Sequence, residues 1–320
     1  MSTLFNRCLY IELADENGKG QKFNARTTNN KDGFDMSFSV VKTSEKEPNE
    51  SSCTLYNLNE ETRRAIEDKY IYCVIYGGYE EEYKLIGMGN ISKVKHSYDS
   101  ATVSTEITFE DGSNQYRDSR INKTYPSGTT YYKILKDISN SMGLPDPKIL
   151  DVDETAVITN SHTLFGSSAK YLKEYCYKNG VRYSIQNNKL IIKKDDTAIT
   201  SNAFVISEET GLVGSIEKTI TKIHKKYNKT RKPLKKPTPK SIAARNRSIA
   251  EATQKFETKQ YDKEHKLQFK TLMIPEIIPG SYLQIQSKFF PKNYCIVKNI
   301  TLAGNNTDGD FGCDIEAIII

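Results

Sequence analysis

Polar and apolar residues alternate along residues 1–110, and this period of two is the main structural signal there. Alternation of this kind is typical of strands with one buried face, because successive side chains point to opposite sides. Turns are predicted at Asn17-Gly18, at Asp32-Gly33 and at Gly77-Gly78. Strands are predicted at Leu9, Ile11 and Leu13, at Met36, Phe38 and Val40, and at Val103, Thr105, Ile107 and Phe109.

One short helix interrupts this β-rich segment. Asn59 is a suitable N-cap, and Glu60 and Glu61 follow it in the first turn, where the helix dipole favours acidic side chains. The helix is predicted to end near Asp68.

The pattern changes to helical spacing in the middle of the chain. A first helix is predicted to end at Gly143, and a second to run from Ser167 or Ser168 to Lys178. A β-hairpin should follow, with its turn at 186–188. The apolar positions of the first helix are Tyr131, Ile134, Leu135, Ile138 and Met142.

The C-terminal part is predicted to be β again. Residues 197–216 form one more strand and a turn in this prediction, and residues 263–320 carry several strands. The stretch from Asn305 to Gly312 is a turn, and a strand from Cys313 to Ile320 closes the chain.

Residues 218–262 lack a sustained apolar period and are predicted to be a basic extended insertion. Twelve Lys or Arg residues and no acid occur from Lys218 to Arg247. Subtracting these twelve charges from the net charge of +6 leaves −6 on the rest of the chain. Three prolines between residues 233 and 239 remove backbone donors at its centre.

The basic insertion has two interpretations, an assembly arm and a nucleic-acid-binding segment. Positive charges neutralise phosphates, but stacking on bases needs aromatic rings, and only Tyr227 lies between residues 218 and 247. The interpretation as an assembly arm is preferred, and no stable binding of nucleic acid is expected. The residues of this candidate arm are Lys225, Lys226, Arg231, Lys232, Lys235, Lys236, Lys240, Arg245 and Arg247.

No catalytic, cofactor-binding or metal site is predicted, so the chain is not expected to be an enzyme. The four histidines are isolated from one another in sequence. The stretch Asn306–Asp310 fails as a calcium loop, because Phe311 stands at its sixth position and Ala317 at its twelfth. Gly87-Met88-Gly89 is better explained by a turn between strands than by a dinucleotide site. The carboxylates of Asp151, Asp153 and Glu154 are interpreted as a solvated loop.

Neither a signal peptide nor a membrane-spanning stretch is predicted. The six cysteines are spread along the chain with no CxxC pair, which indicates free thiols in a protein made in a reducing cytoplasm.

Several stretches of the sequence are specific enough to compare with known families. The most specific are Ile206-Ser207-Glu208-Glu209-Thr210-Gly211-Leu212-Val213-Gly214 and Pro275-Glu276-Ile277-Ile278-Pro279-Gly280. Others are Leu55–Leu58, Arg120–Thr129, Phe165–Leu172 and Ile185–Leu190. In chain order they resemble the hub family of phage tails, which contains the late-control protein D type and the related VgrG spikes of type VI secretion. The family often has an aromatic residue such as Trp in its final hairpin, where this chain has Phe311 and Cys313. Residues 218–262 look like an insertion at a place where the family usually connects directly, so the resemblance assigns them no role.

The resemblance implies a mainly β fold, in which two tube-type β-barrel domains flank a small α+β region. The first barrel covers residues 1–110, the α+β region 111–196, and the second barrel 197–217 joined with 263–320. It further implies a homotrimeric ring that joins a sixfold tail tube, or a tube initiator, to a threefold central spike of a phage tail or contractile injection particle. The resemblance also implies that the protein contacts a tape-measure protein. It is expected to assemble in the bacterial host cytoplasm and to reside in the baseplate of the virion. The alternative role, also structural, is that of a spike component of a type VI-like secretion system.

Overall fold

The computed structural model describes residues 6–27, 31–44, 48–80, 82–144, 146–223, 262–288, 290–307 and 309–320. The chain forms two compact units, Met1–Glu217 with Leu267–Ile320, and Lys218–Lys266. Of the second unit, residues 218–223 and 262–266 are described, and they belong to two strands. The first unit contains the α+β region and most of the main sheet.

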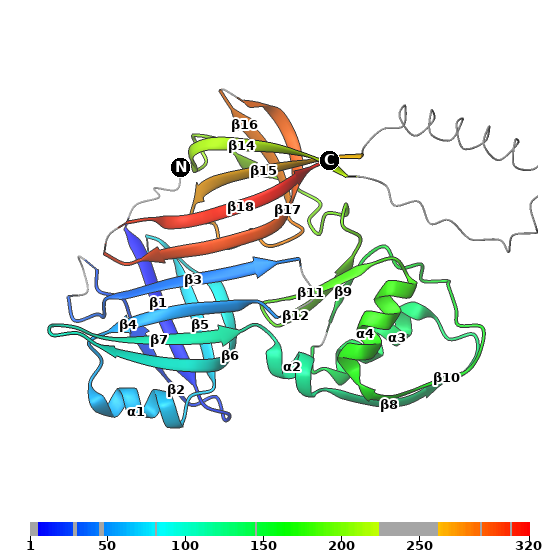
Figure 1. Cartoon of the computed structure of the whole chain (residues 1–320), viewed down its shortest axis with the longest axis horizontal. Coiled ribbons are helices and arrows are strands. Elements are labelled where there is room, and N and C mark those ends of the chain that lie inside the picture. Colours follow the sequence, from blue (N-terminus) through cyan, green and yellow to red (C-terminus); the bar gives the residue numbers. More distant parts are fainter. Residues whose placement is uncertain are drawn as a thin grey trace, which may run out of the picture. The chain divides into compact units, whose positions relative to one another are not determined.

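A 13-stranded sheet dominates the first unit (Figure 1). Its path is β14-β15-β18-β17-β3-β4-β7-β6-β5-β1-β2, and β16 joins β17 and β13 beside this path. Its N-terminal strands are β1 (Arg7–Ala14), β2 (Gly20–Asn24), β3 (Met36–Thr43), β4 (Glu50–Tyr56), β5 (Tyr72–Tyr79), β6 (Glu82–Tyr98) and β7 (Val103–Glu110). Its C-terminal strands are β13 (Phe204–Ile206), β14 (Leu212–Ile223), β15 (Asp262–Leu272), β16 (Tyr282–Ser287), β17 (Phe290–Asn305) and β18 (Phe311–Ile319).

Strands β17 and β3 connect the N-terminal and C-terminal parts of the chain. They pair antiparallel from Asn299 opposite Thr43 to Asn305 opposite Ser37. The strands of both predicted barrels therefore belong to one sheet, and the division into two barrel domains stays a prediction.

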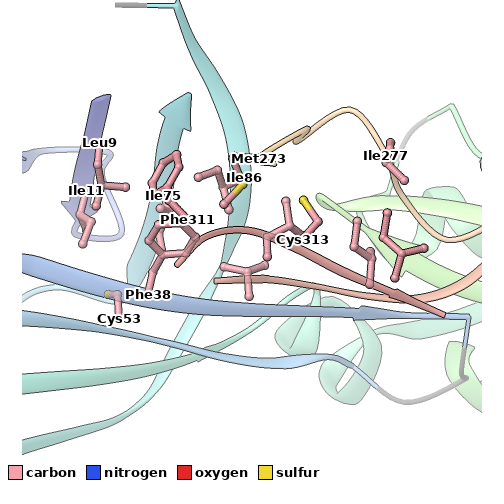
Figure 2. Close-up of a cluster of buried hydrophobic side chains, with 14 of the residues drawn as sticks. Leu9, Ile11, Phe38, Cys53, Ile75, Ile86, Met273, Ile277, Phe311 and Cys313 are labelled. Carbon is pink, nitrogen blue, oxygen red and sulfur yellow. The ribbon is translucent and has the colours of Figure 1, made fainter. Parts of the chain in front are cut away.

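The predicted strand alternation is confirmed in β1, β3 and β7, whose apolar residues are buried at every second position. Their side chains enter one core that draws on both ends of the sequence (Figure 2). In that core the ring of Phe38 meets the ring of Phe311 edge to face, at 5.9 Å between centroids. Helix α1 (Glu60–Asp68) adds Ile66 to the core, and the Asn59 side chain accepts a hydrogen bond from the Thr62 N–H, as its capping role predicts.

Two predicted turns are wrong. Gly77-Gly78 lies inside β5, and Gly87-Met88-Gly89 lies inside β6. A Cβ atom at Gly77 would meet the Ile86 side chain at 2.8 Å, and one at Gly87 would meet Val40 at 2.7 Å. These glycines serve close contact between strands, which glycine permits because it has no side chain.

The boundaries after residue 197 also differ from the prediction. The strand expected within 197–216 is divided into the short β13 and the long β14, and β14 continues to Ile223, six residues into the predicted insertion. Ile216 packs against the core, and the β-branched residues Thr219, Ile220, Thr221 and Ile223 suit a strand. The hairpin turn before the last strand is confirmed, because β17 and β18 pair antiparallel around it.

The α+β region has its own apolar core. Helix α3 (Tyr131–Ser141) buries Ile134, Leu135 and Ile138, and α4 (Ser168–Lys178) is capped by Ser167, so both predicted helices are confirmed. Helix α2 (Ser113–Asp118) and the strands β8 (Arg120–Tyr125), β9 (Lys148–Ile149) and β10 (His162–Ser167) lack a clear sequence pattern. The predicted hairpin is β11 (Arg182–Gln186) with β12 (Lys189–Lys193), and β9 pairs parallel with β12.

Candidate assembly interface

The outward face of the central strands is polar. Residues that alternate with the buried side chains of β3 and β4 are Ser37, Ser39, Ser52 and Thr54, all of them half-buried. Thr108 continues this row on β7, where it lies opposite Ser52. Short hydroxyl side chains thus form one row on this face, and Glu106 lies beside them, opposite Thr54.

The same sheet carries a shallow groove of about 570 Å³ across β14, β15, β18 and β17. Three carboxylates line it, those of Glu217, Asp314 and Glu316, together with one ammonium group, that of Lys270. The Lys270 Nζ lies 3.5 Å from an oxygen of Asp314, which leaves the groove with a negative balance.

Both ends of the strand path are edges. Among the described strands, β2 pairs only with β1 and β14 only with β15. An edge strand presents backbone N–H and C=O groups that can pair with another chain. Val213 on β14 is 44% exposed, so this edge also offers apolar surface.

Three tyrosine rings gather beside the β2 edge. The Tyr10 ring stacks on Tyr76 at 4.8 Å and touches Tyr83 at 4.9 Å between centroids. The Lys22 ammonium on β2 lies 3.5 Å from the centre of the Tyr10 ring, in cation–π geometry. Rings that stay partly exposed in this way are common in protein interfaces.

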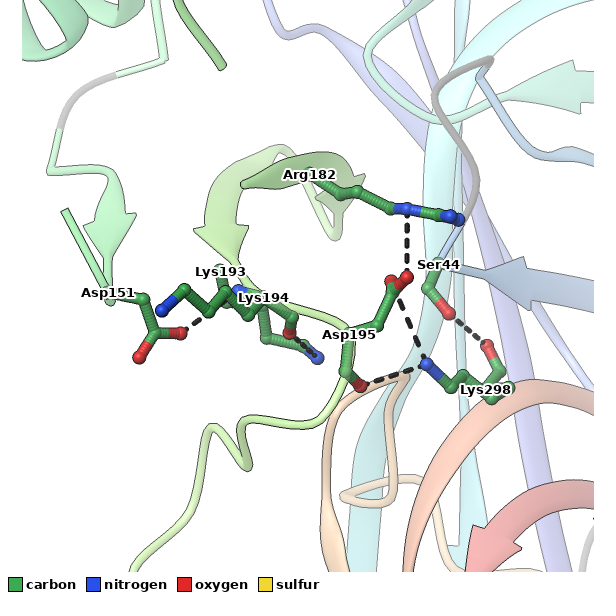
Figure 3. Close-up of polar contacts among 7 residues, drawn as sticks. All are labelled: Ser44, Asp151, Arg182, Lys193, Lys194, Asp195 and Lys298. Atoms are coloured by element: carbon green, nitrogen blue, oxygen red, sulfur yellow. Dashed lines mark hydrogen bonds and ion pairs between the residues drawn. The ribbon is translucent and has the colours of Figure 1, made fainter. Parts of the chain in front are cut away.

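A chain of polar contacts joins the α+β region to the main sheet (Figure 3). Asp195 accepts from the Arg182 Nε at 2.9 Å, while its backbone oxygen accepts from the Lys298 Nζ at 2.9 Å. The hydroxyl group of Ser44 in turn donates to the Lys298 carbonyl oxygen at 2.8 Å. Burial and the charge of Lys298 together lower the pKa of the neighbouring Lys193 to about 8, against the charges of nearby carboxylates such as Asp195.

A second contact lies at the tip of the β11–β12 hairpin. Asp111 accepts hydrogen bonds from the backbone N–H groups of Asn187, at 2.5 Å, and Asn188, at 2.8 Å. The Gln186 side chain donates to the Thr43 carbonyl oxygen at 2.6 Å. No sequence pattern assigns these residues to a contact, because only the fold brings positions 43, 111 and 187 together.

The nine basic residues of the candidate arm all lie outside the described residues. Their role as an assembly arm stays a prediction. Lys218, which begins the predicted insertion, lies in β14.

Two of the four histidines, His96 and His162, make local structural contacts. The His96 Nε2 lies 2.8 Å from an oxygen of Glu67, and its Nδ1 lies 2.9 Å from the Thr105 hydroxyl oxygen. The His162 ring stacks on Tyr175 and shares a hydrogen bond with its hydroxyl group. Within the described residues, no group of three or more His, Cys, Asp or Glu side chains is placed to hold a metal ion.

The loop carboxylates hold backbone turns. Partial burial raises the pKa of Asp151, but hydrogen bonds from Thr197 and Lys194 outweigh this effect, so the net shift is downward. Hydrogen bonds from Thr155 lower the pKa of Asp153. Both groups are therefore hydrogen-bonded acceptors, and their arrangement is that of structured turns.

None of the described helices combines the length and the apolar character that crossing a membrane requires. No curated protein matches the sequence.

Solved structures of phage tail proteins share the fold. A 43 kDa tail protein of prophage MuSo2 from Shewanella oneidensis aligns over 97% of this chain and 98% of its own, with TM-score 0.56 and 10% identity. A tail protein from Neisseria meningitidis MC58 aligns over 98% and 97%, with TM-score 0.57 and 8% identity. The Escherichia coli c3393 protein, a type VI secretion component described as similar to the phage T4 tail proteins gp27 and gp5, aligns over 89% and 73%, with TM-score 0.53 and 12% identity.

The sequence itself matches the family described as baseplate hub gp41 over residues 28–221, which is more than half of the chain. This match confirms the resemblance to the hub family and includes the strands β3 to β7 and the α+β region. The chain therefore belongs to the baseplate hub gp41 family, and its role is that of a structural protein of the tail baseplate.

Proposed function

We propose that three copies of this chain form a ring that joins the tail tube to the central spike. The observation that carries the proposal is the single sheet with an edge strand at each end of its path, β2 and β14. Two different edges on one chain allow head-to-tail contacts, which close into a ring when the rotation between copies is a simple fraction of a turn.

The hydroxyl-rich sheet face suits the wall of the passage through such a ring. Short uncharged side chains such as Ser39 and Thr54 leave the surface smooth. The carboxylates of Glu217, Asp314 and Glu316 add negative charge on the same sheet. Negative charge repels the phosphates of DNA in transit, so the wall would let nucleic acid pass without retaining it.

The partners follow from this geometry. One side of the ring would meet the sixfold tube or its initiator, and the other the threefold spike, with the tape-measure protein as a further contact. The ring would assemble in the host cytoplasm before it enters the virion. No enzymatic step is needed for this role, and no cofactor is assigned to it.

The basic residues from Lys225 to Arg247 are proposed to contact an acidic surface of a neighbouring subunit or tail protein. The rest of the chain, with its net charge of −6, offers such a surface in the same particle. Contacts of this kind accelerate association and fix its register, and salt screens them. Replacing the nine candidate residues by Gln should slow ring formation at low salt, and an unchanged rate would count against the arm.

Native mass spectrometry of the full chain with its spike protein tests the ring. The expected species contains three copies of the chain, and a strictly monomeric or dimeric chain at assembly concentrations would contradict the proposal. Val213→Lys places a charge on the β14 edge and should reduce the trimer about tenfold or more, as an interface charge left unpaired does. Tyr177→Lys is the matched control, because Tyr177 is 85% exposed on α4, a helix of the α+β region and not a strand of the main sheet. Equal trimer loss in both variants would show that the β14 edge is not a ring contact.

A further inference from the structure

The main sheet and the α+β region have separate apolar cores. The core of the sheet includes residues from β1 to β18, and that of the α+β region includes residues from Ile121 to Ile192, with no buried residue common to both. Polar contacts at the hairpin tip and around Asp195 join the two. Water can replace polar contacts of this kind at small cost, whereas an apolar core cannot be opened so readily.

The chain passes from the sheet to the α+β region at Asp111 and Gly112, directly after β7. Gly112 has φ +66°, a conformation that favours glycine, and a Cβ atom there would meet the Ile185 side chain at 2.7 Å. The residue that begins the connection is therefore in contact with the hairpin that returns to it.

Asp111 holds that hairpin by its turn. Asn187 and Asn188 have φ values of 51° and 58°, and this left-handed turn points both N–H groups at the Asp111 carboxylate. Hydrogen bonds to a charged acceptor are stronger than neutral ones. Asp111 is 7% exposed, so water does not compete for these bonds while the contact is closed.

Lys42 is buried beside this contact. It lies on the core side of β3, is 2% exposed, and its Nζ has no hydrogen-bond partner among the described residues. Burial raises the pKa of Asp111. The hydrogen bonds from Asn188 and Asn187 and the charge of Lys42 lower it, but the effect of burial is larger. Burial likewise lowers the pKa of Lys42 to about 8, against the charge of Asp111. Both charges would be better solvated in water, so the closed contact has an electrostatic cost.

We propose that Asp111 is a releasable latch, and that the α+β region turns as one body on the Asp111–Gly112 connection when the Asn187–Asn188 turn leaves its carboxylate. The hydrogen bonds keep the latch closed. When it opens, these bonds are lost, but Asp111 and Lys42 are solvated again, and this solvation offsets the loss of the bonds. Such a joint lets a hub protein adjust the α+β region to a neighbour without unfolding either core.

Hydrogen exchange of the full chain, followed by mass spectrometry, tests the latch. Asp111→Ala removes both acceptors, so peptides spanning the Asn187–Asn188 turn should exchange about tenfold faster or more. Peptides from α3 and α4 should keep their protection, because their core is separate from the joint.

Asp15→Ala is the matched control. The Asp15 Oδ1 also accepts two turn N–H groups, from Asn17 at 2.8 Å and Lys19 at 2.9 Å, but within a single hairpin. This variant should speed exchange only at its own turn. The double variant Lys42→Met/Asp111→Ala leaves no unpaired ammonium group in the core, and it should release the Asn187–Asn188 turn as the single variant does.

Two results would overturn the proposal. Unchanged exchange at the Asn187–Asn188 turn in both Asp111 variants would show that the carboxylate does not hold the hairpin. In the double variant, hydrogen exchange could also become faster by the same factor at the turn, in α3 and α4 and in the main sheet. That result would show that the two cores open together, so that no joint exists between them.

Discussion

The hydroxyl group of Tyr79 on β5 donates a hydrogen bond to the carbonyl oxygen of Phe311 on β18, at 3.1 Å. The same oxygen of Tyr79 accepts from the Met273 N–H at 3.2 Å, and the rings of Tyr79 and Phe311 meet edge to face. Burial raises the pKa of Tyr79, so its hydroxyl group remains a donor throughout the neutral range. One side chain of the N-terminal part thus connects two segments of the C-terminal part, and the two ends of the sequence form one folded core.

Tyr79→Phe should lower the free energy of unfolding by about 1–3 kcal/mol, because a buried carbonyl oxygen and a buried N–H group lose their partner. Urea denaturation followed by circular dichroism measures the change. Tyr177→Phe is the control, since Tyr177 is exposed and its loss should cost less than about 0.5 kcal/mol. Equal values for the two variants would show that the Tyr79 hydroxyl group does not help to hold the two parts together.

The elements with a strong period could be predicted from the sequence. Alternation at Leu9, Ile11 and Leu13 indicated β1, and the helical spacing from Ile134 to Ile138 indicated α3. The period fails where glycine serves close packing, as at Gly77 and Gly87, since glycine also signals turns.

The pairing of β3 with β17 could not be predicted, because a sequence period specifies which face of a strand is buried and not which strand lies beside it. The joint at Asp111 was missed for a similar reason. The partners of Asp111 are two backbone N–H groups, and the residue types in a sequence do not indicate which backbone groups bind a side chain.

Asn59→Ala should destabilise the protein by about 0.5–2 kcal/mol, because the Thr62 N–H at the start of α1 loses its acceptor. Asn59→Asp keeps an oxygen at the same place and should cost much less. Thermal unfolding of the three proteins in parallel compares them. If Asn59→Asp is as unstable as Asn59→Ala, capping is not the role of this side chain.

The native protein should react slowly with thiol reagents, and the denatured, unreduced protein should show six free thiols. All six cysteines are buried thiols that form no disulfide bond with one another in the structure. Burial raises the pKa of Cys295 to about 12 and of Cys313 to about 11, which keeps them as unreactive thiols.

Cys53 and Cys73 make this count informative. Their sulfur atoms lie 3.7 Å apart in the core, although the sequence spacing gave no sign of a pair. A count of four in the denatured, unreduced protein would identify an oxidised pair. The double variant Cys53→Ser/Cys73→Ser then separates the two cases. If both cysteines are reduced, the count should fall from six to four; if they form an oxidised pair, the count should stay at four.

Lys42 should make the protein more stable as the pH rises from about 8 towards 10.5. Burial lowers its pKa in the folded protein from 10.5 to about 8, and the charges that oppose this shift are those of Asp111 and Cys313. Between these two values the unfolded chain binds the proton that the folded chain has released, so the contribution of Lys42 to the free energy of unfolding increases with pH. The full size of this contribution would be about 3 kcal/mol.

The thiols of Cys73, Cys295 and Cys313 act in the opposite direction, since their raised pKa values make stability fall as the pH rises. The comparison is therefore made between the protein and its Lys42→Met variant, which share these thiols, by urea denaturation at several pH values from 7 to 10. The stability of the protein minus that of the variant should grow more positive along the series. A difference that stays constant with pH would mean that Lys42 is not buried as a charge, and the electrostatic cost assigned to the Asp111 joint would then be absent.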